Sequence, residues 1–175
     1  MTLQQYKDWC KMVGLDIKPH QLEGFKWCIS RETTDEKIKG GIICDEMGLG
    51  KTILMLGCIM INPVEHTLIV VPAALLNQWK TCIQLFLKHK VCIYHGQYVK
   101  NMTLKEIQSK QIVLTTYGMI ASRGALYQSL LWKVQWNRLV CDEAHHMRNP
   151  KTNICKGAFR ILSDIKWMVT GTPIQ

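Results

Sequence analysis

The sequence predicts an α/β fold in which helices cover both faces of a mostly parallel β-sheet. Short, wholly apolar segments alternate along the chain with amphipathic ones. Strands that are apolar on both sides are typical of a parallel sheet buried on both faces. A glycine-rich segment joins the first such strand to an apolar helix, and two carboxylates close a later strand. Ligands of open α/β sheets bind at the carboxyl ends of the strands, so these two segments mark the expected site.

The first 30 residues show helical spacing of large apolar side chains, among them Trp9, Met12 and Phe25. Residues 31–39 are charged and lack apolar anchors, which predicts a surface loop. Short apolar runs predict strands near residues 41–45, 67–71, 91–94, 112–115, 138–142 and 167–170. Apolar residues at helical spacing predict helices near residues 51–60, 74–88, 103–109, 117–131 and 152–163.

Length and composition indicate one folded domain of 175 residues, 47% of them hydrophobic and 20% charged. We expect a helical N-terminal segment in residues 1–30 and the α/β domain in residues 31–175. The N-terminus is too polar for a signal peptide, and the longest apolar stretch, residues 53–61, is too short to span a bilayer. These features predict a soluble intracellular protein that does not associate with membranes. The sequence does not decide between nucleus and cytoplasm.

The chain has eight cysteines, none of them in a Cys-x-x-Cys pair, and most lie in apolar runs. Since no secretory signal is present, we expect reduced thiols rather than a disulfide framework. Cys141 is close in sequence to His145 and His146, a combination that would also suit zinc. Because Cys141 falls within a predicted strand, a buried cysteine beside two helix-face histidines is the better interpretation.

The formal net charge of +9 favours a polyanionic partner that is bound electrostatically and without sequence preference. The basic residues are spread over several segments rather than gathered in one run. A generally basic protein without such a partner is the alternative that charge alone leaves open.

The segment from residue 44 to residue 52 has the order that a phosphate-binding loop requires. Glycines let backbone N–H groups approach a triphosphate, and the helix that follows directs its positive end at the anion. Lys51 would contact the β- and γ-phosphates, and the Thr52 hydroxyl would bind Mg²⁺. The general pattern has glycine where this chain has Asp45, so a glycine-rich turn with an exposed lysine is the alternative. The residues expected to contact nucleotide are Glu46, Met47, Gly48, Leu49, Gly50, Lys51 and Thr52.

Two carboxylates follow the predicted strand near 138–142. Asp142 is placed to hold the Mg²⁺ of a Mg-nucleotide, and Glu143 to orient and deprotonate the attacking water. Taken alone, the pair would equally suit the first turn of a helix, where carboxylates cap the chain and complement the helix dipole. The lysine-containing loop upstream makes the catalytic interpretation the stronger one.

Together these motifs resemble the SNF2-type, helicase-like ATPases of superfamily 2. In that family aspartate is usual at the position of Asp45. Further segments match in the family's order: residues 17–27 resemble its Gln motif, 68–79 its motif Ia, 112–117 the next DNA-side segment and 169–175 its motif III. The resemblance extends over roughly residues 15–175, which is nearly the whole chain.

The resemblance implies a RecA-like P-loop NTPase lobe, the first of two, that binds ATP and Mg²⁺. It implies that Gln21 reads the adenine edge and that His145 links the metal site to motif III. Coupling of nucleotide state to DNA would involve His145, Thr170, Gly171 and Thr172. A structural histidine, a surface glutamine and an ordinary Gly-Pro turn are the alternatives.

The resemblance also places two segments against the phosphates and sugars of duplex DNA, which would be bound without base readout. The residues concerned are Pro72, Ala73, Thr115, Thr116 and Tyr117, with Lys80 and Arg123 adding positive charge. For the two basic residues a solvated helix face is an equal alternative. Trp79 and Trp136 are candidates for base stacking, but core packing is favoured for both.

Two functions remain. The first is the N-terminal ATPase lobe of an SNF2-like translocase that moves on duplex DNA, with a second RecA-like lobe supplying arginine fingers and completing the cleft. The second is a single-lobed nucleotide- or DNA-binding module with little or no turnover. A P-loop kinase or GTPase fits poorly, because Asp-Glu-Ala-His and the Gln motif would have no role in it. In either case we expect the chain alone to hydrolyse ATP slowly.

Overall fold

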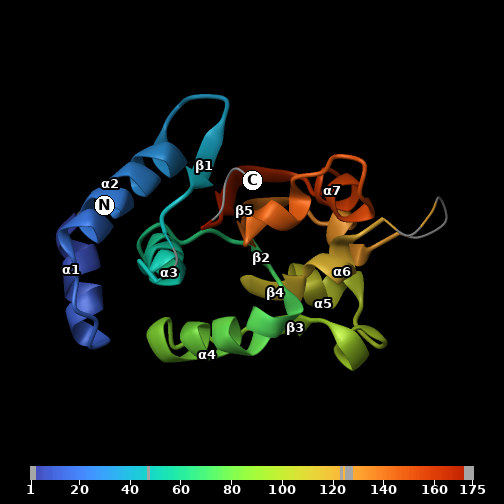
Figure 1. Ribbon diagram of the computed structural model, residues 1–175. Coiled ribbons are helices and arrows are strands. Elements are labelled where there is room, and N and C mark those ends of the chain that lie inside the picture. Colours follow the sequence, from blue (N-terminus) through green and yellow to red (C-terminus); the bar gives the residue numbers. More distant parts are fainter. Residues whose placement is uncertain (1–2, 47, 123, 125–127, 172–175) are drawn as a thin grey trace.

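The structure, a computed structural model, describes residues 3–46, 48–122, 124 and 128–171 (Figure 1). Its centre is one sheet of six strands in the order β1-β6-β5-β2-β4-β3, and every neighbouring pair is parallel. The strands are β1 (Lys39–Ile43), β2 (Thr67–Val71), β3 (Cys92–Tyr94), β4 (Ile112–Thr116), β5 (Trp136–Asp142) and β6 (Ser163–Val169). This arrangement confirms the predicted parallel α/β fold.

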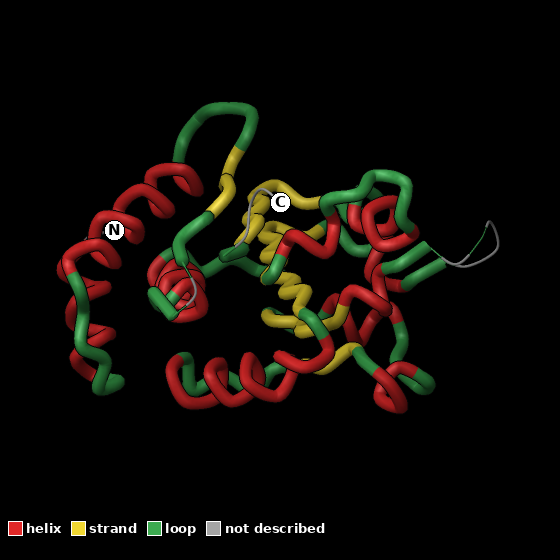
Figure 2. Tube along the Cα trace, in the orientation of Figure 1, coloured by secondary structure: helices red, strands yellow, loops and turns green. Residues whose placement is uncertain are grey.

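Helices cover both faces of the sheet, as Figures 1 and 2 show. One hydrophobic core packs one sheet face against α1 (Leu3–Met12), α2 (Pro19–Thr33), α3 (Lys51–Ile61) and α4 (Leu76–Phe86). A second core packs the opposite face against α5 (Leu104–Gln108), α6 (Tyr117–Ile120) and α7 (Asn153–Ala158). Short 3-10 turns complete the described elements: η1 (Ala73–Leu75), η2 (Gly96–Val99), η3 (Leu130–Lys133) and η4 (Ala144–Met147).

Strand β2 shows why its sequence is apolar throughout. Successive side chains of a strand point to opposite faces of the sheet. Leu68 and Val70 therefore enter the second core, while Ile69 and Val71 enter the first, and all four are fully buried. A strand covered on both sides has no polar face, which is why these runs were recognisable in the sequence.

The helix predicted over residues 117–131 is too long, since α6 ends at Ile120; residues 123 and 125–127 of that prediction lie outside the described residues. The main chain turns there, and the Ser122 N–H donates to the Asn153 carbonyl at 2.8 Å, which ties this segment to α7. Gly157 of α7 packs against the main chain at Ile120, so closely that a Cβ would collide with the Ile120 carbonyl. The close packing of α6 against α7, a tertiary contact, therefore accounts for the early end of α6.

The helix predicted over residues 152–163 is also too long, because α7 ends at Ala158. Strand β6 instead begins at Ser163, four residues earlier than predicted. Exposed Lys166 lies between the buried side chains of Ile165 and Trp167. This alternation is typical of a strand with one exposed face. It made the boundary between α7 and β6 difficult to locate in the sequence.

The predicted loop over residues 31–39 is wrong at its start, because α2 continues to Thr33 and buries Glu32. Glu32 Oε1 accepts hydrogen bonds from Arg138 Nε at 2.7 Å and from Trp167 Nε1 at 2.8 Å. Its Oε2 pairs with the same guanidinium and accepts a bond from Asn62 Nδ2 at 2.7 Å. The carboxylate thereby joins α2 to β5 and β6, and a charge pattern alone does not reveal such a partner.

Among the elements described, no helix is long and apolar enough to cross a membrane. All eight cysteines are free thiols, which confirms the expectation of no disulfide framework. Cys141 is fully buried within β5, in agreement with the prediction of a core cysteine.

The buried ion pair gives a stability prediction. Glu32→Ala leaves Arg138 charged and buried without its partner, so we expect the free energy of unfolding to fall by roughly 3–5 kcal/mol. The control is Glu36→Ala, which removes the exposed partner of Arg31 and should cost about 1 kcal/mol or less. Urea unfolding measures both variants. Similar losses in the two would show that the Glu32 pair is not the strong constraint inferred here.

Candidate functional site

The carboxyl ends of β1, β6 and β5 meet at one edge of the sheet. Ile43 lies opposite Val169, and Val169 lies opposite Asp142. The Thr170 N–H then donates to the Ile43 carbonyl at 3.0 Å, which ties the end of β6 to the start of the glycine-rich loop. Segments from three distant parts of the sequence, all predicted to be functional, are therefore neighbours.

The glycine-rich loop reaches α3 through two residues in the left-handed region. Gly48 and Gly50 both have φ of 85°, a conformation that residues with a Cβ rarely adopt. Gly50 is the N-cap of α3, so Lys51 and Thr52 are the first two residues of a helix of 11 residues. The free N–H groups and the positive dipole end of this helix face the loop, which is the arrangement that binds phosphate. Met47 lies outside the described residues.

The Lys51 ammonium is held by its own loop. Its Nζ donates to the carbonyl oxygens of Asp45 at 2.7 Å and Glu46 at 2.8 Å. The residue is only 9% exposed, although a lysine is seldom buried without a partner. The ammonium has three N–H donors, so an anionic ligand at this loop could accept from the third or take the place of these carbonyl oxygens.

Gln21, near the start of α2, packs against the same loop. Its Oε1 accepts from the Lys18 N–H at 3.1 Å, which fixes the side chain, and its Nε2 donates to the Leu49 carbonyl at 3.2 Å. A Cβ on Gly50 would lie 2.5 Å from Gln21 Nε2. The structure thus brings Gln21 to the predicted site, while its reading of adenine stays a prediction.

Asp142 is nearly buried at the end of β5 and is held by three hydrogen bonds. Its Oδ2 accepts from Trp79 Nε1 at 2.7 Å, its Oδ1 from the Glu143 N–H at 3.0 Å, and its main-chain oxygen from the Tyr117 hydroxyl at 2.6 Å. Burial raises the pKa of the Asp142 carboxyl, and the charge of Glu143 raises it further. The bonds from Trp79 and the Glu143 N–H, together with the charge of Lys51, lower this pKa without cancelling the rise.

Glu143 combines a strained backbone with an unsatisfied carboxylate oxygen. Its φ of 51° and ψ of 50° are left-handed, at a cost of roughly 1–2 kcal/mol for a residue with a Cβ. Its Oε2 is buried and accepts no hydrogen bond from the described residues. It does lie 3.2 Å from His145 Nδ1, an ion pair when the imidazole is protonated. Strain of this kind is concentrated at functional sites.

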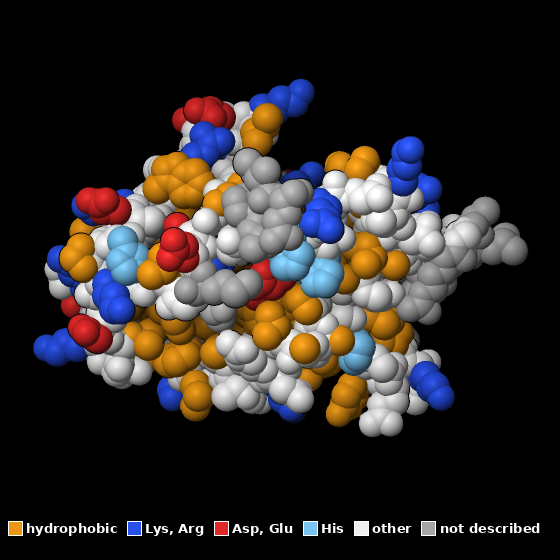
Figure 3. All heavy atoms as spheres, in the orientation of Figure 1, with side chains coloured by type: hydrophobic (Ala, Val, Ile, Leu, Met, Phe, Trp, Pro, Cys, Tyr) orange, Lys and Arg blue, Asp and Glu red, His pale blue; other side chains and the backbone are white. Residues whose placement is uncertain are grey.

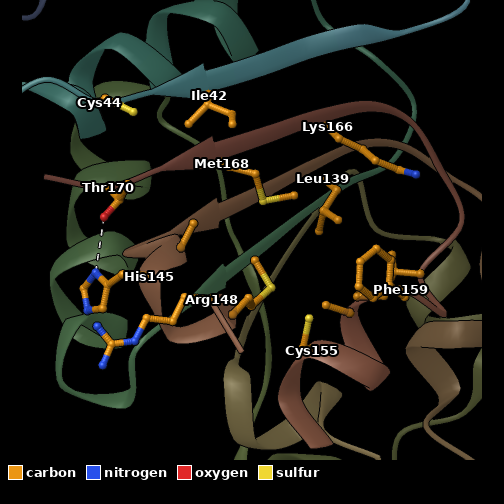
Figure 4. Close-up of a pocket in the computed structure, with 14 residues that line it drawn as sticks. Ile42, Cys44, Leu139, His145, Arg148, Cys155, Phe159, Lys166, Met168 and Thr170 are labelled. Carbon is orange, nitrogen blue, oxygen red and sulfur yellow. Dashed lines mark hydrogen bonds between the residues drawn. The ribbon is translucent and has the colours of Figure 1, made fainter. Parts of the chain in front are cut away.

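His145 lies between this carboxylate and the end of β6. Its Nδ1 is 3.2 Å from Thr170 Oγ1, the contact drawn as a dashed line in Figure 4. The neighbouring ring of His146 stacks on it at 4.7 Å and lies 5.2 Å from the Tyr117 ring. His145 therefore contacts both Glu143 and Thr170, while the predicted role of His145 in linking the metal site to motif III stays a prediction. Gly171 follows Thr170 directly, and Thr172 lies outside the described residues.

The segments predicted to contact DNA are only partly exposed. Ala73 is exposed and Pro72 half-buried at η1, and Lys80 is half-buried on α4. Thr115, Thr116 and Tyr117 are buried. Their side chains make internal hydrogen bonds, Thr115 to the Tyr94 carbonyl at 2.8 Å and Thr116 with His95 Nδ1 at 3.0 Å, and contact of this segment with DNA stays a prediction. Arg123 lies outside the part of the chain that the structure describes.

The contact that Trp79 makes with Asp142 was not predicted from the sequence. Burial of Trp79 and Trp136 confirms that both belong to the core, at 1% and 0% exposure. A buried indole N–H needs an acceptor, and for Trp136 it is the Leu131 carbonyl at 2.9 Å. For Trp79 the acceptor is the Asp142 carboxylate. The sequence did offer a clue to this contact. A buried indole N–H needs an acceptor, and Trp79 lies on a helix that follows β2, the strand that pairs with β5.

An apolar cavity of about 590 Å³ adjoins the site on the α7 side of the sheet (Figure 4). Ile42, Leu139 and Met168 line its sheet wall, and Phe159 its far side. His145 and Thr170 also line it, whereas Lys51 and Asp142 do not. Two cations, Arg148 and Lys166, also line it, but Gly48, Gly50 and the start of α3 do not, so the cavity lies beside the expected phosphate site rather than at it.

In the view of Figure 3, Lys and Arg side chains lie scattered around the face, while histidine and acidic side chains adjoin near its centre. The scattered distribution agrees with the spread of basic residues along the sequence.

Comparisons with known sequences give a consistent family assignment. A family model described as the SNF2-related domain matches residues 20–175. The chain is 33% identical over 185 residues to an uncharacterized ATP-dependent helicase of Schizosaccharomyces pombe, covering 91% of this chain and 18% of the relative. It is 31% identical over 182 residues to the DNA repair protein RAD5B of Arabidopsis thaliana, covering 82% and 14%. The chain therefore spans less than a fifth of the length of these relatives.

Solved structures agree. The Sulfolobus solfataricus SWI2/SNF2 ATPase core in complex with dsDNA matches with a TM-score of 0.75 and 28% identity, over 90% of this chain and 32% of that one. The ATPase core domain from the same organism matches with a TM-score of 0.73 and 27% identity, over 91% and 32%. These likenesses confirm the RecA-like fold that the sequence predicted.

The two left-handed glycines give a matched test of the loop. Gly48→Ala and Gly50→Ala should each lower the free energy of unfolding by roughly 1–2 kcal/mol, because both have φ of 85°. Gly50→Ala also displaces the Gln21 amide, whereas a Cβ at Gly48 meets nothing within 4 Å. We therefore expect Gly50→Ala to cost about 1 kcal/mol more in urea unfolding. Equal losses would contradict the close packing of Gln21 on the loop.

Proposed function

The chain belongs to the SNF2-related domain family, and we propose that it is the first, nucleotide-binding lobe of a DNA-dependent ATPase that moves along duplex DNA. In this proposal residues 1–30 form the helical segment with the Gln motif, and residues 31–175 form the lobe. The observation that carries the proposal is the convergence of Lys51, Asp142 and Thr170 at one edge of the sheet. A second RecA-like lobe would close the nucleotide cleft from the other side.

The residues present fit ATP with Mg²⁺. Mg²⁺ in nucleotide sites uses one or two protein ligands together with phosphate oxygens and waters. Asp142 and the Thr52 hydroxyl would supply those ligands. When bound, Mg²⁺ would neutralise charge on the β- and γ-phosphates.

The side chains of the site have distinct tasks in this proposal. Lys51 exchanges its two loop carbonyls for phosphate oxygens, with no change in its own charge. Glu143 Oε2, which is buried and accepts no hydrogen bond from the described residues, accepts one from the attacking water and then its proton. His145 holds Glu143 beside Thr170, so that a movement of motif III alters the position of the base.

Two substitutions separate binding from chemistry. Lys51→Ala removes a cation that meets the phosphates of bound ATP, so we expect nucleotide affinity to fall at least tenfold, on the order of one charge-assisted hydrogen bond. Glu143→Gln preserves affinity and removes hydrolysis, because the base acts on the water in the transition state. Titration with a fluorescent ATP analogue and a phosphate-release assay measure the two effects. Equal loss of affinity in both variants would refute the assignment of Glu143 as the base.

Turnover by the 175-residue chain alone should be slow, since a lobe without trans-acting arginines lacks a contribution of roughly 10³–10⁵ in rate. The matching measurement is phosphate release with and without duplex DNA. Rapid, DNA-stimulated hydrolysis by this chain would show that the lobe needs no second lobe.

Duplex DNA is the partner that charge and family suggest. The net charge is +9, and the proposed contact segments offer backbone amides, hydroxyls and scattered basic side chains, so binding should rest on phosphate contacts, tolerate any sequence and fall steeply with salt. Fluorescence titration of two unrelated duplexes across a salt series tests this. Salt-independent binding, or a strong preference for one duplex, would argue against contacts with the backbone. Absence of binding at low salt would favour a nucleotide-binding module without DNA.

A further inference from the structure

Both segments predicted to face DNA contribute an aromatic hydrogen-bond donor to Asp142. Trp79 belongs to α4, which follows η1 and its exposed Ala73. Tyr117 is the first residue of α6, directly after β4. The Trp79 indole binds the carboxylate at 2.7 Å, and the Tyr117 hydroxyl binds the main-chain oxygen at 2.6 Å. The proposed metal ligand is therefore fixed from both segments at once.

Both donors are buried, so water does not compete for these bonds. Trp79 is 1% exposed and Tyr117 is 4% exposed. A phenol hydroxyl is protonated at neutral pH, so Tyr117 remains a donor.

We propose that Trp79 and Tyr117 are positioning residues that couple the DNA-facing segments to the metal-binding carboxylate of Asp142. The inference rests on the proposed function, because it gives these two bonds a task in nucleotide and DNA binding. It adds a route beside the contact of His145 with Thr170, since the Trp79 bond reaches the carboxylate without passing through motif III.

The physical basis is the steep dependence of a hydrogen bond on its geometry. Ala73 and Trp79 are six residues apart on a continuous run of η1 and α4, so a displacement of η1 by DNA is transmitted to the indole. The carboxylate must then rotate or lose the bond. Hydrogen bonds to metal-ligating carboxylates typically affect metal affinity by 10- to 100-fold when removed, so a small shift suffices to change Mg²⁺ binding.

The test uses Trp79→Phe and Tyr117→Phe, with Trp136→Phe as the matched control. Trp136 is also fully buried and donates its indole N–H, but to the Leu131 carbonyl at the opposite end of β5. Each variant keeps an aromatic ring and loses one buried hydrogen bond. Three quantities are measured on the 175-residue chain: the urea midpoint, the Mg²⁺ concentration for half-maximal binding of a fluorescent ATP analogue, and the factor by which duplex DNA changes that analogue's Kd.

Trp79→Phe should raise the Mg²⁺ concentration for half-maximal analogue binding roughly tenfold. It should also bring the factor by which duplex DNA changes the analogue's Kd close to one. Tyr117→Phe should move both quantities in the same direction. Trp136→Phe should lower the urea midpoint comparably to Trp79→Phe and leave both binding quantities unchanged. Wild-type binding values in the Trp79 and Tyr117 variants, or equal shifts in the control, would overturn the coupling role. The coupling role would also be overturned if duplex DNA left the analogue's Kd unchanged in the wild-type chain. A wild-type chain that binds no Mg-nucleotide would overturn the proposed function itself, and this inference with it.

Discussion

Strands β1, β6 and β5 run parallel, with Ile43 opposite Val169 and Val169 opposite Asp142. The candidate site depends on this register. Because the three strands end at the same edge, the residue that follows each of them enters the same space, whatever the separation along the chain. A shift of one residue in β5 would direct the Asp142 side chain to the other face of the sheet.

Strand β5 also takes part in a buried ion pair that holds this edge of the sheet in place. Arg138 lies four residues before Asp142 in β5, about 13 Å away along an extended strand. Its buried pairing with Glu32 joins β5 to α2, and the N-terminal end of α2 places Gln21 on the glycine-rich loop. Buried charges are expensive, so they specify one arrangement strongly even when they add little stability. The left-handed Glu143 at the site is a strain that such a framework can hold.

The sequence was most informative where local chemistry is decisive. Gly50, Lys51 and Thr52 follow an apolar strand, and the two carboxylates end another, so both halves of the site were predictable. The prediction of a mostly parallel sheet followed from strands such as β2, which are apolar on both faces. The length of α6 and α7 was not predictable, because it depends on the packing of Gly157 against the main chain at Ile120.

Contacts between residues far apart in the sequence could likewise not be predicted. Glu32 looks like an ordinary surface charge in sequence, and only the fold brings Arg138 to it. Trp79 was predicted to lie in the core, but the acceptor of its N–H is 63 residues away. Thr115 was predicted by resemblance to belong to a DNA-side segment, and a resemblance does not say which atoms of a segment are exposed; its hydroxyl donates to the Tyr94 carbonyl inside the fold.

The central claim is that a triphosphate binds at the glycine-rich loop between Lys51 and Asp142. A crystal structure of the chain with Mg²⁺ and a slowly hydrolysed ATP analogue tests it most directly. The account predicts that Lys51 Nζ leaves the carbonyls of Asp45 and Glu46 for phosphate oxygens, and that Asp142 keeps its bond from Trp79 while facing the metal. A nucleotide bound elsewhere, such as in the apolar cavity beside β6, with Lys51 still on its loop carbonyls, would contradict it.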